Sequence, residues 1–227
     1  MRFLFPGIGV SFVVSGLIAP NLATVAAPLP NRTVSISQQP VETNILRGNG
    51  VEFVAPRGFR GGMPSATETK FIVQAATAEF PAYASLVEGT FRDPSVFRLF
   101  AINTAKSTTK NVELVLVQRL PIPVDTSLAD LNRTMKQLLP SILPPEFKLV
   151  DSQVVTVGSR QIVRCNVTMN VGGLKFYESM ALIKEGDEVF QLIYGFAHDR
   201  SGQADATFDR MIRTFKSTPT TLQTSPI

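Results

Sequence analysis

The segment Val189–Ala197, which reads VFQLIYGFA, is apolar on both faces of a β-strand and decides the expected fold. Because side chains alternate along a strand, its two faces can be assigned directly. One face carries Val189, Ile193 and Ala197, and the other carries Phe190, Leu192, Tyr194 and Phe196. A strand that is apolar on both faces belongs in the centre of a sheet that is covered on both sides.

Three further alternating segments lead up to this strand, and short turns join all four. The segments are residues 147–157, 161–169 and 174–184, and the turns fall at 158–159, 172–173 and 185–187. Such short connections can join only antiparallel neighbours, so we expect an antiparallel meander. Earlier strands are predicted at residues 50–55, 96–102 and 112–117.

Three segments have the period of an amphipathic helix, namely residues 66–79, 127–139 and 201–216. In the first, one face carries Phe71, Ile72, Ala75 and Ala76. The second starts with Ser127 and, three residues on, Asp130, which is a capping-box pattern. With few helices available, we predict an α+β fold: a single antiparallel β-sheet flanked by helices on both faces.

The N-terminus has the pattern of a secretory signal peptide. Arg2 precedes an apolar run that ends near Ala19, and small residues follow up to Ala26. We predict a signal peptide at 1–26, a disordered linker at 27–44, a folded domain at 45–216 and a disordered tail at 217–227. A signal peptide implies export, to the periplasm, the extracellular space or a thylakoid lumen. The alternative is an uncleaved membrane anchor, although the apolar run is short for a bilayer.

Charge and cysteine content narrow the classes of partner. The formal net charge is +4 and no run of like charge occurs, which argues against nucleic-acid binding. Cys165 is the single cysteine, so an internal disulfide is excluded, and no cysteine stands at the cleavage site to carry a lipid anchor. We expect a monomer with a protein or membrane-complex partner.

Candidate chemistry is sparse. The pair His198-Asp199 holds the only histidine, and we interpret it as the corner between a strand and a helix rather than a catalytic or metal site. Cys165 alternates with apolar residues and is predicted to be buried. The glycine-rich stretch at 58–62 is predicted to be a turn, and Glu113 and Glu178 are expected to be solvated. No catalytic, cofactor-binding or metal-binding residue is predicted.

Four aromatic residues in or beside residues 64–94 have two possible roles. They are Phe80, Tyr83, Phe91 and Phe97. Either they pack in the core, which we favour, or they mark a surface that binds a partner.

The order of elements resembles the PsbP-like fold. This fold is shared by an extrinsic subunit of photosystem II, a nuclear Ran-binding protein and many exported bacterial proteins. The residues that carry the resemblance are Gly50–Pro56, Leu128–Leu131, Val154–Gln161, Gly172-Gly173, Val189–Tyr194 and Phe208–Phe215. Residues 64–94 have no counterpart in this pattern and are expected to form a helical insertion.

The resemblance implies a non-enzymatic accessory or binding protein outside the cytoplasm, which associates with another protein or with a membrane complex such as a photosystem. The alternative is a small-ligand carrier or a hydrolase, with a pocket between the sheet and the insertion at 64–94.

Overall fold

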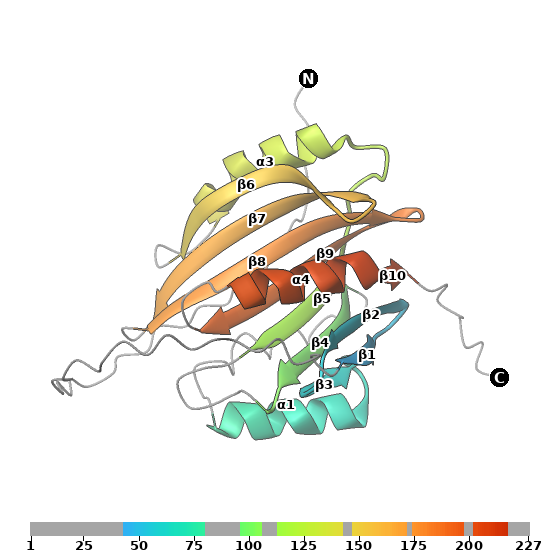
Figure 1. Ribbon diagram of the computed structural model, residues 1–227, viewed down its shortest axis with the longest axis vertical. Coiled ribbons are helices and arrows are strands. Elements are labelled where there is room, and N and C mark those ends of the chain that lie inside the picture. The colour runs from blue at the N-terminus through green and yellow to red at the C-terminus, as the bar shows by residue number, and fades with distance from the viewer. Residues whose placement is uncertain are drawn as a thin grey trace, which may run out of the picture.

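The computed structural model describes residues 43–79, 96–105, 113–142, 147–171, 174–197 and 202–217. Within them the chain folds into two β-sheets and three helices (Figure 1). The helices are α1 (Thr67–Glu79), α3 (Leu128–Ile142) and α4 (Gly202–Thr214). The α+β class predicted from the sequence is therefore confirmed.

The larger sheet has seven antiparallel strands in the order β3-β4-β5-β9-β8-β7-β6. Their bounds are β3 Phe59–Gly62, β4 Phe97–Asn103, β5 Leu114–Leu120, β6 Phe147–Val157, β7 Arg160–Val171, β8 Leu174–Glu185 and β9 Glu188–Ala197. Strand β9 occupies the middle position, as its two apolar faces predict, and β6 to β9 form the expected meander.

A second, three-stranded sheet corrects the prediction of a single sheet. It has the order β1-β2-β10, with β1 at Thr43–Arg47, β2 at Val51–Pro56 and β10 at Lys216–Ser217. The central strand pairs with both neighbours antiparallel, so the first and last described strands of the chain lie in one sheet. The stretch predicted as a glycine-rich turn is also different, because its last four residues form β3.

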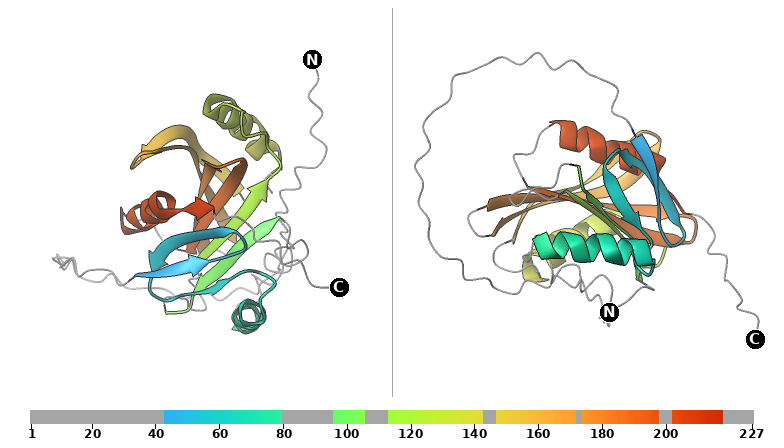
Figure 2. Two further views of the ribbon diagram at one scale, coloured as in Figure 1. Left: turned by 90° about the vertical axis from the view of Figure 1, so that its right-hand side faces the viewer. Right: turned by 90° about the horizontal axis from the view of Figure 1, so that it is seen from below.

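Two hydrophobic layers hold the sheets and helices together. The small sheet and α4 cover one face of the large sheet, and residues such as Phe53, Phe208 and Phe215 fill that layer. Helix α3 packs on the other face, where Leu131 and Leu139 meet the strands (Figure 2). Helix α1 lies beside β3 and β4. The large sheet is thus covered on both faces, on one of them partly by a second sheet rather than by helices alone.

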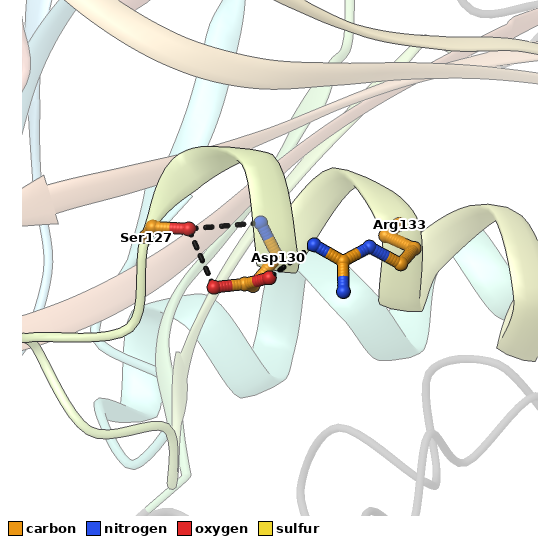
Figure 3. A network of polar contacts seen from close by, with 3 residues as sticks. All are labelled: Ser127, Asp130 and Arg133. Atoms are coloured by element: carbon orange, nitrogen blue, oxygen red, sulfur yellow. Dashed lines mark hydrogen bonds and ion pairs between the residues drawn. The ribbon is translucent and has the colours of Figure 1, made fainter.

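The start of α3 confirms one half of the predicted capping box, the bond from the Asp130 backbone to the Ser127 side chain (Figure 3). Ser127 Oγ accepts a hydrogen bond from the Asp130 backbone N–H at 3.0 Å and donates one to Asp130 Oδ2 at 2.6 Å. Arg133 forms an ion pair with the same carboxylate. The bond from Ser127, followed by the charge of Arg133, lowers the pKa of Asp130. A negative charge that persists in the first turn stabilises the helix dipole.

Candidate functional site

Five of the residues considered as site candidates from the sequence lie outside the described residues. These are His198, Asp199, Phe80, Tyr83 and Phe91. The pair His198-Asp199 falls between the end of β9 at Ala197 and the start of α4 at Gly202. Its role as a corner stays a prediction.

Phe97 is buried rather than exposed. Only 8% of the residue is accessible, and it lies in the hydrophobic layer on the α3 side of the large sheet. Core packing was one of the two roles predicted for it. Phe97 therefore does not contribute to an exposed partner surface.

Helix α1 instead exposes a different aromatic residue. Phe71 is 71% accessible, the highest value for a large hydrophobic side chain in the described parts of the chain, while its neighbour Ile72 is buried at 8%. The prediction that Phe71 and Ile72 lie on one face of the helix is therefore wrong. Ala75, one turn after Phe71, is also exposed, and at the start of the helix Glu68 forms an ion pair with Arg60 at 3.6 Å. We call Glu68, Phe71 and Ala75 the α1 outer face.

A buried polar network lies at one end of the large sheet, where β4, β5 and β9 meet. Tyr194 Oη donates a hydrogen bond to Glu113 Oε1 at 2.8 Å, and Asn103 Nδ2 donates one to Glu113 Oε2 at 2.5 Å. Tyr194 and Asn103 are fully buried and Glu113 is half-buried, which corrects the expectation that Glu113 is solvated. The sequence did carry a signal for this network, because Glu113 stands directly before an apolar strand.

The protonation of this network indicates a structural role rather than a catalytic one. Burial, and then the nearby charge of Glu113, raise the pKa of Tyr194. The phenol therefore stays protonated at neutral pH and acts as a donor that compensates the partly buried carboxylate. The three side chains tie together strand ends that are far apart in sequence.

Glu178 on β8 is the second carboxylate that was expected to be solvated and is partly buried instead. The residue is partly exposed as a whole, yet its Oε2 atom is shut off from solvent and has no hydrogen-bond partner among the described residues. Across the strands it lies beside Val167 and Gly195. Burial in this apolar setting raises the pKa of Glu178 from 4.5 to about 7.

Cys165 is fully buried on β7, as the alternating pattern predicts. Its Sγ lies 3.2 Å from Ser152 Oγ, and that hydroxyl donates to Asn132 Oδ1 of α3 at 2.6 Å. Burial raises the pKa of Cys165 to about 11. A buried thiol that stays protonated is neither a nucleophile nor a redox centre under ordinary conditions.

A small cavity lies under α3 and not beside α1. Its volume is about 40 Å³, room for a few water molecules, and its walls include Leu131, Met135 and Leu182. The amide of Gln191 lies at its edge and donates a hydrogen bond to Met180 Sδ at 3.1 Å. This position differs from the pocket expected between the sheet and residues 64–94.

Two ion pairs join α4 to the large sheet. Arg164 on β7 pairs with Asp209 at 2.9 Å and with Asp205 at 3.6 Å, and its guanidinium carbon lies 5.1 Å from the centroid of the Phe208 ring. Its side chain is 11% accessible. All three partners lie on one face of α4, so the contact fixes the helix in position and rotation.

Among the described residues, no three His, Cys, Asp or Glu side chains gather closely enough to hold a metal ion. Nor does any helix there have the length and apolar character needed to cross a bilayer.

Comparison with known proteins finds similarity only among solved structures. No protein-family model matches the chain, and no curated protein matches its sequence. A cyanobacterial PsbP from Synechocystis is 14% identical, with a TM-score of 0.45, and the match covers 81% of this chain and 97% of that one. The Ran-binding protein Mog1p of Saccharomyces cerevisiae is 11% identical, with a TM-score of 0.45 and coverage of 78% and 96%.

A third similar structure is LpqN of Mycobacterium tuberculosis, a protein involved in cell envelope biogenesis. It is 13% identical, has a TM-score of 0.42, and the match covers 84% of this chain and 99% of that one. The similar structures thus include a PsbP and a Ran-binding protein, the two kinds of protein named in the resemblance predicted from the sequence. At TM-scores below 0.5 they assign neither a partner nor an activity to this chain.

Proposed function

We propose that this protein is an exported binding protein, without catalysis of its own, that attaches to another protein through the α1 outer face. The observation that carries the proposal is the exposure of Phe71, at 71%. Aromatic side chains are enriched in the buried centres of protein interfaces, and they supply large contact areas at low entropic cost. Export rests on the signal-peptide pattern of residues 1–26.

The arrangement around Phe71 suits an interface of this kind. Ala75 leaves room for a partner side chain beside the ring, and the Arg60–Glu68 pair supplies charged groups at the rim. Burying a phenylalanine side chain contributes about 1.5–3 kcal/mol. We therefore expect Phe71→Ala to weaken binding by about ten- to a hundredfold.

Site-specific photo-crosslinking in the native host tests the proposal. A photoreactive amino acid replaces Phe71 in one variant and Val124, in the segment that leads into α3, in a matched control; Val124 is 37% exposed. We expect one dominant protein adduct from position 71 and none from position 124. Equal adducts from both positions, or none from position 71, would contradict the proposed surface.

The absence of catalysis has its own test. The purified protein is screened for hydrolysis of generic ester, phosphoester and peptide substrates, together with a Tyr194→Phe variant. Turnover that depends on the Tyr194–Glu113 network would replace the binding proposal with an enzymatic one.

A further inference from the structure

The longer edge strand of the large sheet is β6, and α3 packs against it from one face of the sheet. This strand is 11 residues long, and no described strand pairs with its outer side. The opposite edge, β3, has four residues, and both β1 and α1 pack against it (Figure 1). In addition, the Asn44 side chain donates a hydrogen bond to the Phe59 carbonyl at 3.2 Å.

Only the first half of β6 is protected against pairing. A bulge interrupts its register between Leu149 and Asp151, and α3 reaches the strand at Ser152 through Asn132. From that residue on, the run Ser152–Val157, SQVVTV, contains no charge, glycine or proline. Val154 in this run is 40% exposed. Edge strands are normally guarded by charges, prolines or bulges, so an uncharged and β-branched edge is unusual unless it is paired.

The backbone of this half presents free groups at a regular spacing. Val157 and Arg160 are paired across a two-residue turn, so their N–H and C=O groups bond each other. Because these groups alternate in direction along an antiparallel strand, those of Ser152, Val154 and Thr156 point away from β7. An incoming strand can bond all three residues.

We propose that the outer edge of β6 pairs antiparallel with the same edge of a second copy of this chain, with Val154 on the two-fold axis. A second copy offers no other open edge of its large sheet in the described residues, so the contact is isologous and closes as a dimer. In this register Val154 faces its own copy and Ser152 faces Thr156 of the other chain. Asp151 faces Val157, so no like charges oppose each other.

This dimer replaces the monomer expected from the sequence and is independent of the proposed α1 surface. Helix α1 lies beside β3 and β4, at the other edge of the large sheet. Failure of the dimer leaves the photo-crosslinking test at Phe71 unaffected, and the reverse also holds.

Cysteine crosslinking of the full chain tests the register. Residues that face each other as a hydrogen-bonded antiparallel pair have Cα atoms about 5.5 Å apart, within the range that a disulfide spans. We expect Val154→Cys to give a covalent dimer on mild oxidation. The matched control is Gln161→Cys, which is exposed on β7 one strand further in, and we expect it to stay monomeric. The native Cys165 is buried and does not interfere.

Sedimentation equilibrium of the unmodified protein gives the second readout. We expect the mass of two chains, and we expect Val154→Lys to raise the dimer dissociation constant by about tenfold or more, because two lysines then face each other. A mass of one chain at every concentration, or crosslinking of Val154→Cys no faster than that of Gln161→Cys, overturns the proposal. Both of these readouts stand even if the lysine variant does not fold.

Discussion

Replacing Glu178 by glutamine should remove a pH-dependent loss of stability. In the folded protein burial raises the pKa of this carboxyl from 4.5 to about 7, whereas in the unfolded chain it is solvated and ordinary. Between these two values the folded state holds a proton that the unfolded state has released. Stability is therefore fully present below pH 4.5 and falls as the pH rises to about 7.

The size of the effect follows from the shift. Each pKa unit corresponds to about 1.4 kcal/mol, so the full change from 4.5 to about 7 costs about 3 kcal/mol once the carboxyl is ionised. Glutamine keeps the shape of the side chain and cannot ionise. We expect Glu178→Gln to match the wild type at acid pH and to exceed it by about 3 kcal/mol at slightly alkaline pH.

The assay is urea unfolding at constant ionic strength at several pH values from mildly acidic to mildly alkaline. Glu68→Gln is the matched control, because its side chain is 75% exposed and an exposed ion pair contributes little. A difference between Glu178→Gln and the wild type that stays constant with pH would refute the reasoning. It would show that the carboxyl reaches water in the folded protein.

Three further outcomes are expected. Tyr194→Phe removes a donor from half-buried Glu113 and should lower the free energy of unfolding by about 1–3 kcal/mol in urea titrations; an unchanged midpoint would mean that water replaces the hydroxyl. Arg164→Met leaves Asp209 without its ion pair, so the variant should lose a similar amount, and adding Asp209→Asn should restore part of it. Cys165 should react with a thiol reagent only after denaturant is added, because it is fully buried; rapid labelling of the native protein would contradict its placement.

The meander and the three helices α1, α3 and α4 could be predicted because their signals are local. Alternation and short turns define β6 to β9, and the Ser127–Asp130 box marks the start of α3. Strands β1 and β3 have no such signal. They are short, and β3 reads FRGG; its extended state comes from pairing with β4, far along the chain. The small sheet escaped prediction for the same reason.

Which individual side chains are buried could not be predicted from periodicity, because it depends on how the helices and strands pack. Phe71 and Ile72 are neighbours on a helix, about 100° apart, and only the contact of α1 with β3 and β4 determines which of them is buried. Glu178 could have been recognised, because it alternates with Met180 and Leu182, both buried residues of β8. The polar network at Glu113 required the pairing of β5 with β9, which no local pattern reveals.

The pairing of β2 with β10 also governs when the protein can fold. Strand β2 and helix α4 share one hydrophobic layer, and Phe53 near the beginning stacks on Phe215 near the end, with ring centroids 6.2 Å apart. During synthesis that layer stays incomplete until residues 202–217 have left the ribosome, because its contacts span almost the whole folded sequence. A chain that cannot finish folding before it is fully made remains unfolded long enough to thread through a secretion channel, as the proposed export requires.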